Sequence, residues 1–287
     1  MHIVRYRYQG RISIGILEGE TVRRLPHDSM SALLALPLSD IRSQVDAAPT
    51  TEERPVHDVD LLAPLDGNTE VWAAGVTYLR SKDARVEESD QASVYDLVYD
   101  AERAEIFFKS VAWRVVTDGD PVGIRADSVN SVPESELALV LNAAGERVGY
   151  LVCNDMSSRS IEGENPIYLP QAKIYAGACA LSPGIAPAWE VGAPEALSVS
   201  CWVERDGARV FFGESHTGQI KRGLDELTEL LFRADHFPGG AVLSTGTGIV
   251  PDLDFRLRAG DVIEIEIPGV GRLRNEVAVG KDAFGGG

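Results

Sequence analysis

The sequence predicts a strand-rich α+β protein, because short β-type runs separated by turn signals dominate it and helical spacing is confined to a few segments. Residues 2–25 alternate apolar and polar side chains, with turn-like glycines after Gln9 and Glu18, so they predict short strands. The run SMSALLAL that follows has the composition of a short helix. The polar stretch DAAPTTEERPVHD contains two prolines and predicts a linker. We therefore expect a small N-terminal α/β domain over residues 1–65 and a larger domain over residues 66–287.

The larger domain opens with the apolar run TEVWAAGVTY, which predicts a strand that ends at Gly75. The charged segment LRSKDARVEES then predicts a helix. Residues 90–105 are acidic and form either a mobile helix or lid, or a plain solvated surface. Further strands are predicted for EIFFKS, SELALVL, RVGYLVCND, ALSVSCWVER and DVIEIEI, and AFGGG predicts a flexible end. In QIKRGLDELTELLFRAD, the apolar residues Ile220, Leu224, Leu227 and Leu231 recur at helical spacing.

Composition narrows the class of partner. Hydrophobic residues make up 44% of the 287-residue chain and charged residues 25%, as in an ordinary globular protein. The net charge of −17 argues against a nucleic-acid partner, because phosphate binding needs a basic surface. Cys153, Cys179 and Cys201 lie far apart and predict buried thiols rather than disulfides or a zinc site. The chain lacks a long apolar run and its first residues do not resemble a signal peptide, so we expect a cytoplasmic protein without a membrane partner.

Three carboxylates form a candidate metal site. In the stretch VPESELALV, a strand would point Glu134 and Glu136 to the same face, together with Ala138 and Val140. The turn NAAGER and the second strand VGYLVCND complete a hairpin pattern that would bring Asp155 beside both glutamates. Oxygen-only ligation suits Mg²⁺, and also Mn²⁺ or Ca²⁺. The alternative is an exposed edge strand with ordinary surface glutamates.

The context of these carboxylates resembles the central motif of the fumarylacetoacetate hydrolase family. The resemblance is carried by VPESELALVLNAAGERVGYLVCNDMSSRSIEGENPIYLPQAKIY, by VWAAGVTY, by FFK and by STGTGIVP, and the opening strands are similar to the family's small N-terminal domain. It implies a catalytic domain that is a mixed β-roll and β-sandwich. It also implies that Glu134, Glu136 and Asp155 hold a magnesium or calcium ion.

One position separates two branches of that family. Hydrolases that cleave a carbon–carbon bond usually carry a water-activating histidine where GVTYLRS has Ser81, and serine alone is no general base near neutral pH. The motifs GVTYLRSKDARVEE, NDMSSRSIEGENPIYLPQAKIY and AEIFFK resemble instead the 2-keto-3-deoxy-pentonate dehydratase branch. Ser160 departs from that pattern, which more often has Asp after the arginine. An acylpyruvate-type hydrolase and a non-catalytic member of the fold remain the alternatives.

The dehydratase branch implies a hydro-lyase of pentose catabolism. Its substrate would be a 2-keto-3-deoxy acid that chelates the ion through its carboxylate and C2 carbonyl. The ion would stabilise the enolate formed when a base takes a C3 proton, and loss of the C4 hydroxyl would lead to 2-oxoglutarate semialdehyde. We expect Mg²⁺ as the cofactor, a small-molecule 2-keto acid as the partner, and a homodimer or homotetramer.

Seven further residues are candidates for this site, and three of them (Glu105, Lys109 and Thr247) have a plainer alternative. Glu105 is a candidate base or ligand of a metal-bound water, and otherwise a charged strand edge. Lys173 would stabilise an enolate or shuttle a proton. Lys109 and Arg159 would pair with carboxylates and orient them, and Lys109 could also be a solvated lysine. The remaining candidates would bind substrate: Thr247, otherwise part of a tight glycine-rich turn, and Arg80, together with Ser81 at the start of the expected lid.

Overall fold

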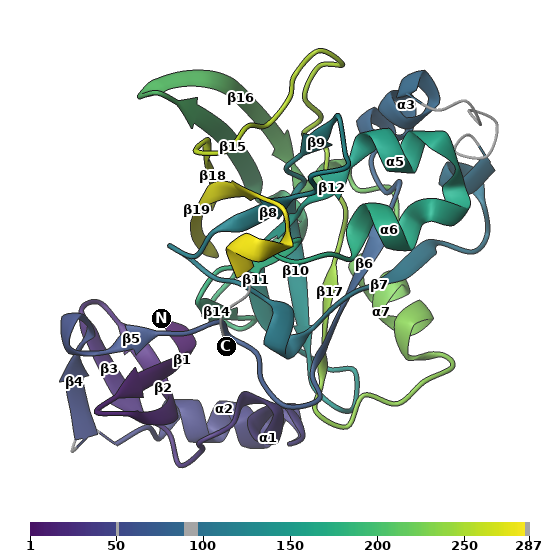
Figure 1. Ribbon diagram of the computed structural model, residues 1–287. Coiled ribbons are helices and arrows are strands. Elements are labelled where there is room, and N and C mark those ends of the chain that lie inside the picture. Colours follow the sequence, from purple (N-terminus) through teal and green to yellow (C-terminus); the bar gives the residue numbers. More distant parts are fainter. Residues whose placement is uncertain (50–51, 89–96, 285–287) are drawn as a thin grey trace.

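The computed structural model describes residues 1–49, 52–88 and 97–284. Strands dominate it and helices are short, so the predicted strand-rich α+β class is confirmed. A small N-terminal lobe, residues 1–61, lies beside a larger lobe that holds the rest of the chain (Figure 1). Much of the acidic stretch that we considered as a lid, and the last three glycines, lie outside the described residues.

The N-terminal lobe is an antiparallel meander with two helices against it. The predicted turns after Gln9 and Glu18 are confirmed, and Gly10 takes a positive φ of 80° that suits glycine. The predicted linker is wrong for its second half, because Arg54 and its neighbours add a strand to the free edge of the third strand. The elements are β1 (His2–Tyr8), β2 (Arg11–Glu18), β3 (Thr21–Arg24), α1 (Met30–Leu34), α2 (Leu38–Asp46), β4 (Glu53–Pro55) and β5 (Asp60–Leu61).

One large sheet runs through both lobes. Its strand order is β4-β3-β2-β1-β14-β11-β10-β17-β6-β7, with β5 paired to β1 and β13 paired to β11. The lobes meet where Ile3 of β1 pairs with Ile185 of β14. The predicted boundary at residue 65 lies in the connection between β5 and β6, and it stays a prediction because sheet and core continue across it. The larger lobe contributes β6 (Glu70–Gly75), β7 (Glu105–Val111), β10 (Ser135–Leu141), β11 (Arg147–Asp155), β13 (Cys179–Leu181), β14 (Gly184–Pro187) and β17 (Ala241–Ser244).

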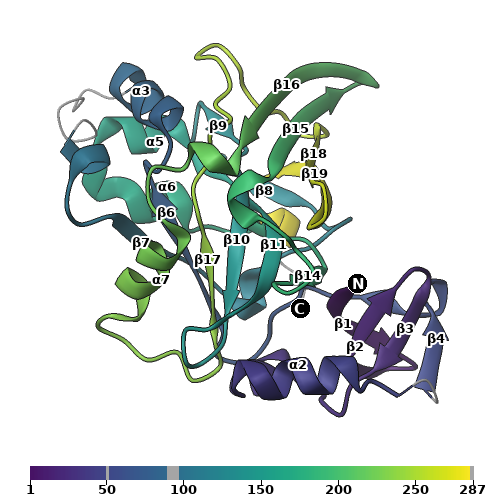
Figure 2. The same ribbon diagram turned by 180° about the vertical axis from the view of Figure 1, so that it is seen from behind.

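A second sheet covers one face of the first and makes a sandwich (Figures 1 and 2). Its order is β16-β15-β18-β19-β8. Leu137 and Leu139 of β10 point into the core between the sheets, whereas Ala138 and Val140 point to the opposite core, as the alternation predicts. The second sheet contains β8 (Val122–Ile124), β15 (Ser198–Arg205), β16 (Ala208–His216), β18 (Val262–Ile267) and β19 (Gly271–Val279), and a separate pair joins β9 (Ser131–Val132) to β12 (Ser157–Ser158).

Three short helices gather at one end of the larger lobe (Figures 1 and 2). They are α3 (Leu79–Glu88), α5 (Arg159–Glu164) and α6 (Leu169–Lys173). The predicted helix around residue 228 is α7 (Leu224–Phe232), which buries Leu224, Leu227 and Leu231, whereas Ile220 precedes it in a bridge to Tyr78. Among the described residues, none of the helices has the length and apolar composition needed to span a bilayer.

Candidate active site

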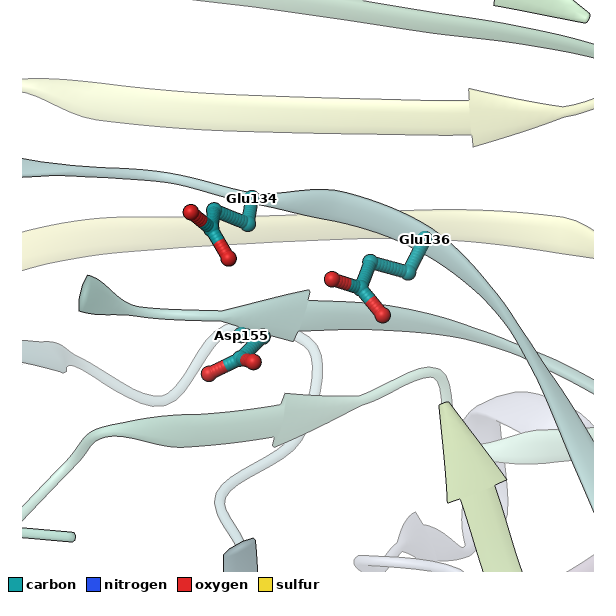
Figure 3. A group of neighbouring side chains, drawn as sticks. All are labelled: Glu134, Glu136 and Asp155. Atoms are coloured by element: carbon teal, nitrogen blue, oxygen red, sulfur yellow. The ribbon is translucent and has the colours of Figure 1, made fainter. Parts of the chain in front are cut away.

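The hairpin of β10 and β11 brings three carboxylates together. Ser135 pairs with Asn154, and the amide of Asp155 donates to the carbonyl of Glu134 at 2.9 Å. Glu134, Glu136 and Asp155 therefore share one face, where their oxygens converge (Figure 3) and an atom of each lies within 4.8 Å of the others. The edge-strand alternative is wrong, because β10 lies between β11 and β17 and each carboxylate is at most 4% exposed.

Glu136 is held by two neutral hydrogen-bond donors. Its Oε2 accepts hydrogen bonds from Ser244 Oγ at 2.6 Å and from the Gly246 amide at 2.7 Å. Burial, together with the negative charges of Asp155 and Glu134, raises the pKa of Glu136 to about 8. A bound divalent cation would offset both causes, and oxygen donors are those that hard cations prefer. The donor set therefore fits Mg²⁺, Mn²⁺ or Ca²⁺.

Lys173 reaches this group from the C-terminus of α6. Its Nζ donates to Glu134 Oε2 and to Ser157 Oγ, both at 2.6 Å, and lies 3.3 Å from Asp155 Oδ2. The Phe107 ring packs beside the same ammonium, with its centroid 5.6 Å away. Lys173 is 2% exposed, so this charge has left water and depends on the carboxylates for compensation.

Two further cationic side chains, Lys109 and Arg159, pair with Asp155 and Glu134. Lys109 pairs with Asp155 and donates to the carbonyls of Met156 and Lys173 at 3.0 and 2.6 Å. The guanidinium of Arg159 donates to Glu134 Oε1 at 2.8 Å. Because Lys109 is 1% exposed, a solvated lysine is ruled out. Both side chains fix carboxylate orientation in the way we expected, and their effect on catalysis stays a prediction.

The carboxylates form one side of a cavity. Glu105 also lines it and is half-buried, at the start of β7, where it pairs with Gly75 of β6. A Cβ atom on Gly75 would overlap the Glu105 carboxylate, so the glycine makes room for that side chain. Gly246 has a φ of 89° and directs its amide at Glu136. The residues that line the cavity are Ala74, Gly75, Val76, Ser81, Glu105, Phe107, Glu134, Glu136, Asp155, Glu162, Lys173, Gly246 and Thr247.

Two of the three predicted substrate-binding residues line the cavity and the third does not. Ser81 and Thr247 are buried and line the cavity. Ser81 Oγ donates to the Tyr78 carbonyl at 2.8 Å, and Thr247 Oγ1 accepts from the Ile249 amide at 3.0 Å. Arg80 is exposed on α3 and does not line the cavity. Contact between substrate and any of these three side chains stays a prediction.

Sequence reasoning missed Glu162, Ser157 and Ser244. The signal for Glu162 was its place three residues after Arg159, which puts both side chains on one face of a helix. Ser157 and Ser244 carried no recognisable signal, because their roles depend on where the strands bring their hydroxyls.

Comparison with known families assigns most of the chain. The model described as "Fumarylacetoacetate (FAA) hydrolase C-terminal" matches residues 70–278. The chain belongs to the fumarylacetoacetate hydrolase family. A second model, described as "Rv2993c-like, N-terminal", matches residues 1–64. The resemblance found in the sequence, and the fold that it implied, are confirmed.

Within the fumarylacetoacetate hydrolase family, the chain is similar to sugar-acid dehydratases. It is 46% identical to a "Probable 2-keto-3-deoxyxylonate dehydratase" of Haloferax volcanii over 85% of this chain and 86% of that protein. It is 36% identical to the 2-dehydro-3-deoxy-D-arabinonate dehydratase of Saccharolobus solfataricus over 91% of each chain. A solved 2-keto-3-deoxy-D-arabinonate dehydratase complexed with magnesium and 2,5-dioxopentanoate has a TM-score of 0.80 and 34% identity, covering 97% of this chain and 99% of that one.

Proposed function

We propose that this protein is a Mg²⁺-dependent dehydratase of a 2-keto-3-deoxy pentonate that forms 2-oxoglutarate semialdehyde. The observation that carries the proposal is the cavity in which Glu134, Glu136, Asp155 and Lys173 meet Ser81. Serine stands there where the family's hydrolases usually carry the histidine that activates water. The names of the similar dehydratases support the same reaction, since 2,5-dioxopentanoate is 2-oxoglutarate semialdehyde.

Glu134, Glu136 and Asp155 would hold the ion, and Lys109 and Arg159 would keep two of these carboxylates in position. The ion, when bound, supplies a Lewis acid that makes the C3 protons of a 2-keto acid more acidic. Ser244 and the Gly246 amide orient Glu136 from the other side. Such fixed orientation is worth a large share of catalysis, because small displacements of reacting groups slow a reaction strongly.

Glu105 and Lys173 are the groups proposed to move protons. One would take a proton from C3, and the other would protonate the C4 hydroxyl as the C4–O bond breaks and water leaves. The electrons of the C3–H bond form the new C3–C4 double bond. Tautomerisation through the enol at C5 then gives the aldehyde, with no redox cofactor. Glu105 and Lys173 line the same cavity.

The proposal is tested by a panel of substrates in Mg²⁺ with product identification by NMR. The panel contains 2-keto-3-deoxy-D-arabinonate, its C4 epimer and an acylpyruvate. We expect 2-oxoglutarate semialdehyde from at least one deoxy acid and no pyruvate from the acylpyruvate. Pyruvate from the acylpyruvate, with every deoxy acid unchanged, would make the protein a hydrolase.

We further propose that the protein is a cytoplasmic homodimer or homotetramer. Trp113, Val129 and Ile167 are 79%, 83% and 77% exposed, and large apolar side chains on a surface are candidates for subunit contact. The three cysteines are free thiols, which suits a reducing compartment. Light scattering during gel filtration should give two or four times the mass of the chain, and a monomer would contradict the assembly.

A further inference from the structure

Glu162 is a carboxylate in the cavity that the proposed reaction leaves without a role. It lies on α5, where the Ser158 side chain caps the helix by accepting from the Ile161 amide. Arg159, one turn earlier on the same face, pairs with Glu134. Glu162 is 4% exposed and lines the cavity together with Glu105 and Lys173, whereas Glu164 on the same helix is exposed.

Glu162 lies apart from the proposed metal ligands and can act as a hydrogen-bond acceptor for a ligand in the cavity. It does not belong to the group of carboxylates whose oxygens lie within 4.8 Å of one another among the described residues. An ionised carboxylate accepts hydrogen bonds and donates none, and its two oxygens have room for about four donors, so a protein partner leaves further acceptor positions. Beside an acidic substrate such a group is unfavourable, unless the substrate offers it a donor.

A 2-keto-3-deoxy pentonate offers two donors, the hydroxyls at C4 and C5. In the proposed reaction Glu134, Glu136 and Asp155 would hold the ion near the 2-keto acid end of the substrate, and the C4 hydroxyl would meet the proton-transferring pair Glu105 and Lys173. The C5 hydroxyl still needs a partner. Of the other polar side chains in the cavity, Ser81 Oγ already donates to Tyr78 O and Thr247 Oγ1 accepts from the Ile249 amide.

We propose that Glu162 accepts a hydrogen bond from the C5 hydroxyl of the substrate and thereby selects hydroxylated 3-deoxy acids. This inference rests on the proposed dehydratase function. It gives Glu162 a part in specificity and not in proton transfer at C3 or C4. It also explains why an acylpyruvate, whose distal oxygen is an acceptor, would be a poor ligand here.

The test compares two substrates that differ only at C5. One is 2-keto-3-deoxy pentonate, and the other is 4-hydroxy-2-oxopentanoate, which keeps the C4 hydroxyl and has a methyl group at C5. Sites built to bind a hydroxyl discriminate strongly against an analogue without it, because their polar groups are left unpaired. We expect wild type to prefer the pentonate in kcat/KM by about 100-fold or more.

Two substitutions at Glu162 should change that preference, mainly through KM. Glu162→Gln, which keeps the shape, should lose about 10-fold on the pentonate and less than about 2-fold on the methyl analogue. Glu162→Leu should abolish or reverse the preference, because an apolar side chain suits the methyl group. Glu164→Gln removes the same charge from the exposed face of the same helix. It should leave kcat/KM unchanged for both substrates.

Thermal unfolding and Mg²⁺ titration calorimetry accompany the kinetics. Unchanged Mg²⁺ affinity in Glu162→Gln, with loss confined to the pentonate, supports the inference. Equal loss on both substrates overturns it, since that would reflect a structural role or a role at C3 or C4. If Glu162→Leu does not fold, Glu162→Gln decides alone. Failure of wild type to dehydrate any deoxy acid would instead refute the proposed function.

Discussion

Glu136, one of the proposed metal ligands, lies where the fold opposes the ionisation of its carboxyl group. Its pKa of about 8 lies above the ordinary value of 4.5, chiefly because of burial and then because of Asp155 and Glu134. Between these two values, the metal-free folded protein keeps a proton that the unfolded chain has released. The metal-free protein should therefore lose stability as pH rises from about 5 to 8, by up to about 1.4 kcal/mol per pH unit from this group.

Urea unfolding in EDTA at several pH values measures this effect. Glu136→Gln has no such group to titrate, so the free energy of unfolding of wild type should fall with pH relative to that of the variant. Stabilisation by Mg²⁺ should grow over the same range, because protons and cation compete for the carboxylates. Parallel pH curves for wild type and variant would show that Glu136 ionises normally.

Lys173 leads to the second prediction at this scale. Lys173→Met keeps the length of the side chain and removes the charge that Glu134 and Ser157 contact. We expect kcat to fall by about 10²–10⁴-fold, the usual effect of losing an acid–base group. Mg²⁺ affinity should persist, since none of the three proposed ligands changes. Single-turnover kinetics measure the rate, and calorimetry measures the Mg²⁺ affinity. Turnover near that of wild type would show that Lys173 takes no part in proton transfer.

At the scale of elements, the paired strands β6 and β7 control the position of Glu105. The carboxylate lies against Gly75, and a methyl group there would meet the flexible end of the side chain rather than backbone. Gly75→Ala should therefore leave the fold nearly intact and move the carboxylate by about 1 Å, which can cost about 10²-fold in rate. Kinetics together with thermal unfolding test this. Wild-type activity in Gly75→Ala would show that the reaction rate does not depend on the exact position of the Glu105 carboxylate.

The strands that the sequence predicted best are apolar runs bounded by turn signals. The run around Leu139 and the run around Val152 became β10 and β11, and their hairpin brought Asp155 to Glu134 as predicted. Alternate side chains of a strand point to the same face, so pairing of the two strands brings the carboxylates together. Local sequence patterns are therefore enough to predict that these carboxylates lie together.

Other elements depend on contacts that a sequence does not reveal. The strand around Arg54 reads as a linker in the sequence, because its last residue, Pro55, and the nearby Pro49 are typical of loops and mask the pairing with β3. β17 is four residues long, and α5 and α6 have six and five residues, too short for a clear periodic pattern. The spacing of Glu162 from Arg159 indicates a shared helix face, but only the packing of α5 shows that this face points into the cavity.

At the scale of the whole molecule, the N-terminal lobe is part of the main sheet. Ile3 of β1 pairs with Ile185 of β14, and Ile3, Ile14 and Ile16 share a core with Val140 and Leu151. A chain of residues 66–287 would expose this core and the edge of β14. We expect that chain to aggregate or to unfold without cooperativity, as judged by gel filtration and calorimetry. A soluble fragment with cooperative unfolding near the wild-type temperature would establish residues 66–287 as an independent domain.

The central claim about this molecule is that its assembled cavity dehydrates a 2-keto-3-deoxy pentonate in the presence of Mg²⁺. The most direct measurement follows 2-keto-3-deoxy-D-arabinonate by NMR with enzyme that has been stripped of metal and then given Mg²⁺. We predict that 2-oxoglutarate semialdehyde forms only after Mg²⁺ is added, with no other organic product. Unchanged substrate, or cleavage to pyruvate and glycolaldehyde, would contradict the account.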